Sequence, residues 1–120
     1  MKTLEVKITY IGGPTALLDW AGIRLLTDPG FDPAGGDYKT GPVVLTKTAG
    51  PALSADALGR VDAVLLSHDH HYDNLDHSGR KLPAQVPQVV TTPAGAERLG
   101  GNAIGLANWQ AIEIARDGQQ

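Results

Sequence analysis

Histidines and aspartates gather in one short stretch near the middle of this 120-residue chain. The stretch contains His68, Asp69, His70, His71, Asp73, Asp76 and His77. Imidazole nitrogens and carboxylate oxygens are the ligands that zinc, manganese and iron accept when thiolate is absent, and the chain has no cysteine. The stretch therefore predicts a divalent-metal site, where the metal would make a bound water acidic enough to supply hydroxide for hydrolysis.

The spacing indicates which of these side chains can share one ion. His68 and His70 are alternate residues, so on an extended chain both imidazoles point the same way and can reach one metal. Asp73 follows after a tight turn and could approach the same ion or a second one. We expect His77 to be solvent-exposed or to cap a helix rather than bind the metal.

Other catalytic chemistries find little support. The serines are Ser54, Ser67 and Ser78, and none lies in a nucleophile elbow. Ser67 adjoins His68, but neighbours on a strand face opposite ways, so we do not expect a Ser–His relay. No glycine run is followed by the lysine of a phosphate-binding loop.

Charge and hydropathy exclude further classes. The formal net charge of −3 leaves no basic surface for nucleic acid and no polybasic signal for anionic lipid. The apolar runs fall far short of the roughly 18 residues needed to span a bilayer. The chain opens without the hydrophobic stretch of a signal peptide. We expect a soluble, cytoplasmic protein that acts on a small-molecule substrate.

The elements that position the histidines begin with three strands. Apolar and polar residues alternate from Leu4 to Ile11, which is typical of a half-buried strand. Two more strands are expected at Thr15–Trp20 and Ile23–Thr27, and the short connections predict an antiparallel meander. Pro29 and Gly30 then end the third strand.

The histidines follow an apolar strand. Residues 30–53 show no sustained period and predict an irregular loop, after which Ser54 caps a single helical turn that reaches Leu58. Asp62–Ser67 is a nearly continuous apolar run, typical of an interior strand covered on both faces. Loops at the carboxyl ends of such strands are where open α/β sheets place ligands and catalytic groups.

The remaining residues predict alternating elements. They are a strand at Gln88–Thr92, a helix at Ala94–Leu99 entered by Pro93, and strands at Ala103–Leu106 and Trp109–Ile114. A β-meander followed by β-loop-α-β-α-β indicates an α+β fold in layers, with residues 1–120 as one domain.

Three stretches of the chain resemble the metallo-β-lactamase superfamily. They are the opening hairpin (8–18), the Thr-Asp-Pro element at 27–29, and the strand with its His-x-His…Asp motif at 61–76. The similarity is greatest to the lactonases and phosphodiesterases related to ascorbate-6-phosphate lactonase and N-acylphosphatidylethanolamine phospholipase D. It implies a four-layer αββα sandwich of two similar halves, roughly two hundred residues or more. The 120 residues would then be the N-terminal half.

The resemblance also implies roles for individual residues. The metal ligands would be His68, His71, His70 and Asp73, supported by Asp28, Asn74 and Asp76. Asp69, Asp73 or a metal-bound hydroxide would handle the proton and nucleophile roles.

Two departures from the family motif leave alternatives open. One residue is inserted between the second histidine and the aspartate, so either His70 binds and the loop bulges, or His71 takes the second position. Asn74 stands where the family has a histidine, which favours one metal over two.

The implied activity is metal-dependent hydrolysis of an ester, lactone or phosphodiester, with zinc as the expected metal and manganese or iron as alternatives. A half sandwich exposes an apolar sheet face, which predicts a homodimer or a missing C-terminal half. The short chain would then be inactive alone or active only on dimerisation. The rival interpretations are a non-catalytic metal-binding half-fold and an oligomerising scaffold.

Overall fold

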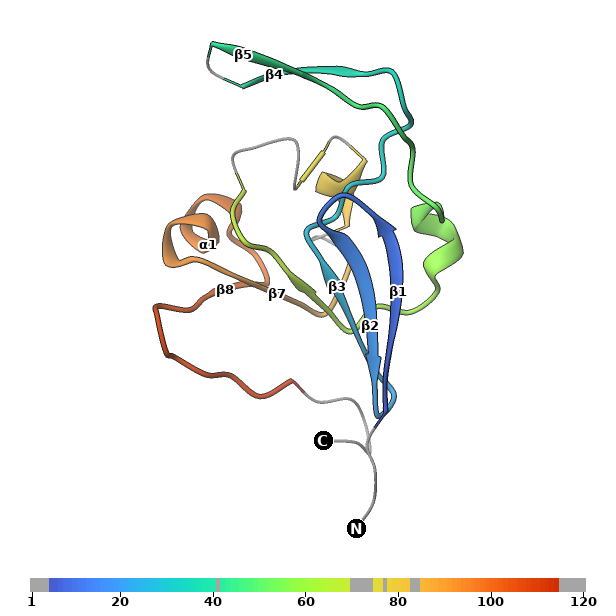
Figure 1. The fold of residues 1–120 in the computed structure, drawn as a ribbon. Coiled ribbons are helices and arrows are strands. Elements are labelled where there is room, and N and C mark those ends of the chain that lie inside the picture. Colours follow the sequence, from blue (N-terminus) through green and yellow to red (C-terminus); the bar gives the residue numbers. More distant parts are fainter. Residues whose placement is uncertain (1–4, 41, 70–74, 77, 83–84, 115–120) are drawn as a thin grey trace.

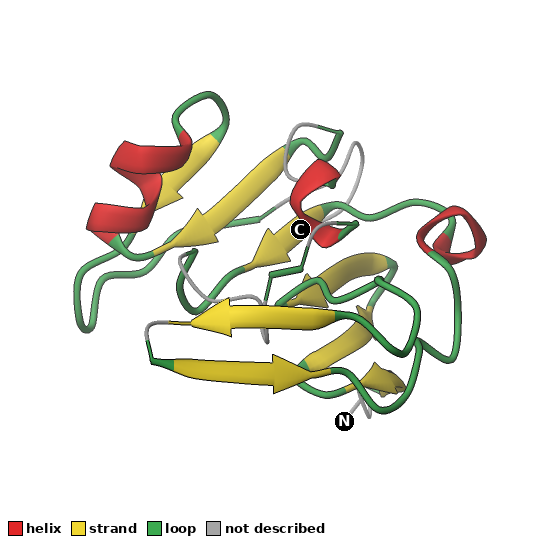
Figure 2. Ribbon diagram, turned by 90° about the horizontal axis from the view of Figure 1, so that it is seen from above, coloured by secondary structure: helices red, strands yellow, loops and turns green. Residues whose placement is uncertain are grey.

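The computed structural model describes residues 5–40, 42–69, 75–76, 78–82 and 85–114. In these ranges the chain forms a six-stranded sheet, a separate two-stranded hairpin, one α-helix and two short 3₁₀ helices (Figures 1 and 2). The mixture of a predominant sheet with few helices confirms the predicted α+β class.

The main sheet has the strand order β1-β2-β3-β6-β7-β8. The strands are Val6–Gly12 (β1), Thr15–Trp20 (β2), Ile23–Thr27 (β3), Ala63–Leu65 (β6), Gln88–Thr91 (β7) and Ala103–Gly105 (β8). The first three pair antiparallel as predicted, whereas β3, β6, β7 and β8 run parallel. The carboxyl ends of β3, β6 and β7 therefore meet at one edge of the sheet, which places a site there.

Helices fill the connections between the parallel strands. The α-helix α1 (Pro93–Leu99) joins β7 to β8. The Thr92 hydroxyl caps it by accepting a hydrogen bond from the Gly95 N–H at 3.0 Å. The 3₁₀ helix η1 (Ala55–Leu58) begins after Ser54, whose hydroxyl accepts from the Ala57 N–H, so the predicted capped turn is confirmed. A second 3₁₀ helix, η2 (Gly79–Lys81), precedes β7.

One face of the sheet carries the core. Leu17, Leu26, Val64 and Val89 lie opposite one another on four adjacent strands, and each is at most 5% exposed. They pack with further buried residues of the loops and 3₁₀ helices. These include Phe31, Leu58, Leu66, Leu75, Leu82 and Val86.

The other face of the sheet is apolar and open over β1 and β2. Val6, Ile8 and Tyr10 alternate along β1 and are 43%, 65% and 66% exposed. Trp20, which pairs with Val6, is 49% exposed. Within the described residues the sheet is therefore covered on one side and carries exposed apolar side chains on the other.

Two predicted segments differ from the structure. Residues 30–53 contain the hairpin β4 (Asp37–Thr40) and β5 (Val43–Thr46), so the expectation of an irregular loop was wrong. β4 and β5 pair with each other and not with the main sheet. Because these short strands do not belong to the core, their sequence lacks the regular apolar alternation that predicts a core strand.

The predicted strand at Trp109–Ile114 is also absent from the described chain. A turn replaces its start, closed by the Gln110 N–H donating to the Ala107 carbonyl at 3.1 Å. Trp109 has a φ of 68° and a fully exposed side chain. An apolar alternation needs a neighbouring strand with which to pair, and β8 has none on that side within the described residues.

Candidate metal centre

The predicted site residues that the structure describes lie around the edge where β3 and β6 end. His68 and Asp69 follow β6, Asp28 follows β3, and Asp76 precedes η2. The other predicted residues, His70, His71, Asp73, Asn74 and His77, lie outside the described residues. The described part of the chain alone contains no group of three or more possible metal ligands, so the ligand set stays a prediction.

Asp28 holds the start of the histidine segment, by which we mean residues 67–76. Its carboxylate accepts two hydrogen bonds from Ser67, one from the backbone N–H at 2.7 Å and one from the hydroxyl at 2.8 Å. Its own N–H donates to the Leu65 carbonyl at 3.0 Å, and its carbonyl accepts from the Thr15 hydroxyl at 2.6 Å. These bonds retain Asp28 at a φ of 27°, a strained value for a residue other than glycine.

Ser67 links Asp28 to the first histidine. Its Oγ lies 2.9 Å from Nδ1 of His68. Because the hydroxyl donates its single proton to the Asp28 carboxylate, it accepts from the Nδ1–H of His68. That tautomer makes Nε2 the nitrogen through which His68 would bind a metal.

The contact between Ser67 and His68 was not predicted. Both residues lie beyond β6, which ends at Leu65, so the strand alternation that would separate their side chains does not apply. The arrangement is nevertheless not a nucleophilic triad. In such a triad the imidazole stands between the carboxylate and the hydroxyl, whereas here the hydroxyl stands between the other two.

Asp76 holds the far end of the segment and is 1% exposed. Its Oδ1 accepts from the backbone N–H groups of Phe31 at 2.9 Å and Gly79 at 2.8 Å. Its Oδ2 accepts from the Asp32 N–H and the Lys47 ammonium, both at 2.7 Å. These partners satisfy a buried charge; the predicted support of an imidazole by Asp76 stays a prediction.

A single loop, residues 28–32, therefore contacts both ends of the histidine segment. The hydrogen bonds of Asp28 and Asp76 are described above. In addition, the Asp32 carboxylate accepts from the Ser78 N–H at 2.7 Å. The packing is close, because a Cβ added at Gly79 would overlap the carbonyl of Pro29. The loop after β3 is thus the scaffold that positions the segment.

Asp69 forms an ion pair with helix α1. Its two carboxylate oxygens accept from Nε and Nη2 of Arg98 at 2.6 to 3.1 Å, a bidentate arrangement. The Asp69 side chain is 8% exposed, and its hydrogen bonds raise the pKa of Arg98 above the ordinary value. The predicted proton-handling role of Asp69 stays a prediction.

Sequence reasoning missed both cationic partners, Lys47 and Arg98. Each lies 29 residues from its aspartate and belongs to no recognisable motif. Their pairing follows from the fold, because the hairpin and α1 bring them to the same edge.

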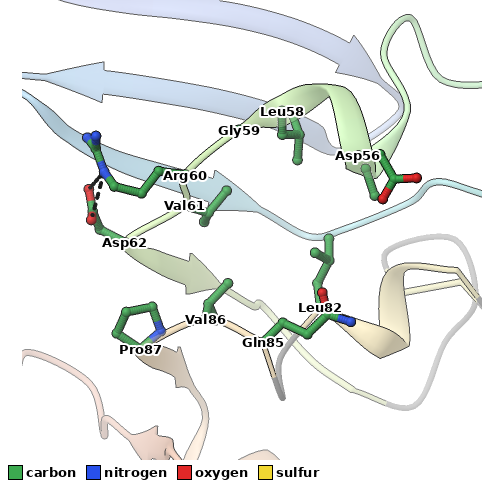
Figure 3. A pocket seen from close by; sticks show the side chains of 11 residues that line it. Asp56, Leu58, Gly59, Arg60, Val61, Asp62, Leu82, Gln85, Val86 and Pro87 are labelled. Carbon is green, nitrogen blue, oxygen red and sulfur yellow. Dashed lines mark hydrogen bonds and ion pairs between the residues drawn. The ribbon is translucent and has the colours of Figure 1, made fainter.

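A shallow hollow of about 410 Å³, largely open to solvent, adjoins Asp28 and Ser67. It is lined by Thr27, Asp28, Leu65, Leu66, Ser67, Val90, Thr91, Thr92 and Leu106. A larger hollow of about 560 Å³ lies near the opposite edge, before β6 and β7, where Figure 3 shows the Arg60–Asp62 ion pair. The smaller hollow is the one beside the histidine segment, so it is the better candidate to receive a substrate.

The fold matches that of a known hydrolase. The crystal structure of isothiocyanate hydrolase from Delia radicum gut bacteria superposes with a TM-score of 0.67 at 22% sequence identity. The match covers 88% of this chain and 43% of that chain. The two proteins share a fold, and the chain spans less than half of the hydrolase.

A family profile described as "Beta-lactamase superfamily domain" matches residues 7–118. The chain therefore belongs to the metallo-β-lactamase superfamily, as its motifs predict. None of the helices in the described ranges is long and apolar enough to cross a membrane.

The chain is also similar in sequence to two longer proteins. An uncharacterized protein of Mycobacterium tuberculosis is 43% identical over 73 residues, which cover 60% of this chain and 18% of the relative. N-acyl-phosphatidylethanolamine-hydrolyzing phospholipase D 1 of Caenorhabditis elegans is 28% identical over 124 residues, covering 92% of this chain and 34% of the enzyme. The match thus covers 18% of one relative and 34% of the other.

Proposed function

We propose that the chain is part of a metal-dependent hydrolase that cleaves an ester, lactone or phosphodiester bond of a small molecule. The observation that carries the proposal is the Asp28–Ser67–His68 chain of hydrogen bonds beside a hollow at the carboxyl edge of the sheet. Carboxyl edges of parallel strands are where such sheets place catalytic groups.

The hydrogen bonding of His68 is of the kind that supports a metal ligand. Metal-binding histidines usually donate their other ring N–H to an oxygen acceptor, which fixes the tautomer and the ring orientation. His68 makes such a bond to Ser67, and Asp28 holds Ser67 in place. The donor set of imidazoles and carboxylate suits zinc first, with manganese and iron as alternatives.

The proposed ligands are His68, His70 or His71, and Asp73. A divalent metal held there supplies Lewis-acid activation of water for attack on the substrate. Asp28 and Ser67 orient His68, whereas Asp73 or Asp69 would take up the proton. Asn74 offers a neutral amide oxygen, a weaker ligand than imidazole, so we expect one metal rather than two.

A metal-binding domain without catalysis is the second candidate. The chain matches 43% of the isothiocyanate hydrolase and 34% of the nematode phospholipase. Residues that complete a hydrolytic centre can lie in the parts that the match does not reach. The chemistry described above would then be limited to holding the ion.

Native mass spectrometry with a hydrolysis assay separates these candidates. We expect about one divalent metal per chain, together with zinc-dependent hydrolysis of a generic lactone or phosphodiester. Metal without turnover would favour the non-catalytic domain. A chain without metal in zinc-supplemented buffer would contradict both candidates and leave the oligomerising scaffold.

We also propose that the open sheet face is the interface of a homodimer. Val6, Ile8, Tyr10 and Trp20 together expose an apolar surface at the edge of the sheet, and surfaces of this kind mark association sites. A two-fold axis would bring the same patch of a second copy onto it.

The dimer predicts a sharp response to charge on this face. Ile8→Lys is expected to convert dimers to monomers, because a lysine buried in an apolar interface costs several kcal/mol. Sedimentation velocity at micromolar concentration measures the change. Val44→Lys is the control, since Val44 is 59% exposed on the separate hairpin. A wild-type chain that sediments as a monomer at this concentration contradicts the dimer.

A further inference from the structure

Lys47 joins the β4–β5 hairpin to the buried carboxylate of Asp76. Its ammonium lies 2.7 Å from Oδ2, and the side chains of lysine and aspartate are 22% and 2% exposed. Figure 1 shows the hairpin apart from the six-stranded sheet, on the side of the edge where β6 ends. Lys47 follows β5 directly, so its ion pair connects the end of the hairpin to this edge.

The backbone of Lys47 is fixed as well as its side chain. Its N–H donates to the Gly36 carbonyl at 2.9 Å, and its carbonyl accepts from the Gly35 N–H at 2.8 Å. These two bonds continue the hydrogen bonding of the hairpin to the residues just before β4. They involve only the backbone of Lys47, so its side chain can extend to Asp76. The ammonium is therefore presented to Asp76 from a rigid base.

The structure describes four donors to the Asp76 carboxylate, and among these only Lys47 donates from its side chain. The other three are backbone N–H groups, which bring no full charge. Without the ammonium, a buried carboxylate would keep its hydrogen bonds to loop 28–32 and to η2 but lose its cation. Such a carboxylate draws in water or shifts toward solvent, because burying an unpaired charge is costly.

We propose that Lys47 is a positioning residue for the histidine segment, acting through Asp76. Asp76 binds the amides of Phe31 and Asp32 on one side and of Gly79 on the other. Any movement of its carboxylate therefore shifts the downstream end of the segment relative to the end that Asp28 holds. The effect on metal binding rests on the proposed function, whereas the effect on the segment itself does not.

The test compares Lys47→Met with Lys47→Arg and with Lys81→Met. Lys81 is an exposed lysine of η2, so its variant has the same change in charge without the ion pair. Zinc affinity is measured by competition with a chromophoric chelator. We expect Lys47→Met to weaken zinc binding about 10- to 100-fold, as for other residues that support a ligand indirectly. Lys47→Arg should retain most of the affinity, and Lys81→Met all of it.

Amide hydrogen exchange supplies a readout that does not need the metal. We expect Lys47→Met to accelerate exchange in residues 28–32 and 75–82 while leaving β1 and β2 unchanged. A purely structural role would lower the thermal midpoint and leave zinc affinity at the wild-type value, which would overturn the proposal. If Lys47→Met does not fold, Lys47→Gln, which keeps a neutral donor, replaces it in the same comparison.

The two proposals can fail separately. A wild-type chain that binds no zinc overturns the proposed function, and the exchange pattern then decides the role of Lys47 alone. Faster exchange confined to the two named stretches supports that role. Exchange that is unchanged in Lys47→Met, or faster everywhere, overturns it.

Discussion

Replacing both His68 and His71 by alanine is expected to abolish metal binding and reduce hydrolysis to the background rate. His68 follows β6 at the edge of the sheet, and its Nδ1 is hydrogen-bonded to Ser67, which leaves Nε2 as the nitrogen proposed to bind the metal. His71 is the histidine that best matches the spacing to Asp73 in the family motif. Removing two neutral imidazoles from a site with few other ligands leaves too few donors for a divalent ion.

Metal content per chain, measured by inductively coupled plasma or native mass spectrometry, checks this result. His77→Ala is the matched control, because we expect His77 to be exposed or to cap a helix and its loss to leave the metal in place. His70→Ala separately decides the register: loss of metal identifies His70 as the second ligand. A double variant that keeps its metal would show that the ligands were chosen wrongly.

The local pattern of the chain was sufficient to predict the elements that face the core. β2 and β3 begin and end where the sequence predicts, because turns that contain glycine or proline bound them. The Ala21–Gly22 turn has positive φ at both residues, 54° and 84°, as two-residue hairpins require. The β4–β5 hairpin and the residues around Trp109 were mispredicted, because their conformation depends on pairing partners rather than on local period.

Some residues of the candidate site could likewise be predicted from the local sequence, and others could not. Asp28 and Asp76 could be picked out because they stand at fixed places in a motif. In the structure Asp28 binds Ser67, and Asp76 binds the loop 28–32. Lys47 and Arg98 could not, because an ion pair across 29 residues depends on how the sheet and hairpin assemble. Residues at fixed places in a motif can therefore be found from the sequence, whereas partners that are distant along the chain are found only from the fold.

Asp76→Ala is expected to lower the free energy of unfolding by about 3–5 kcal/mol, the usual cost of removing one partner of a buried ion pair. Three backbone N–H groups would lose their acceptor, and Lys47 would lose its counter-charge. Because domains are stable by only about 5–15 kcal/mol, the loss removes a large part of the total. Urea unfolding followed by circular dichroism measures it.

Asp56→Ala is the matched control, because Asp56 is an exposed aspartate of η1 and surface changes usually stay within about 0.5 kcal/mol. Asp76→Asn should lie between the two. The asparagine amide keeps one acceptor oxygen, but its NH₂ group replaces the other oxygen and cannot accept. Two of the four hydrogen-bond donors to the Asp76 carboxylate would therefore face another donor. If Asp76→Ala unfolds at the same urea concentration as Asp56→Ala, the buried carboxylate does not hold loop 28–32 against η2. The histidine segment would then depend on its other contacts, among them Asp28 with Ser67 and Asp69 with Arg98.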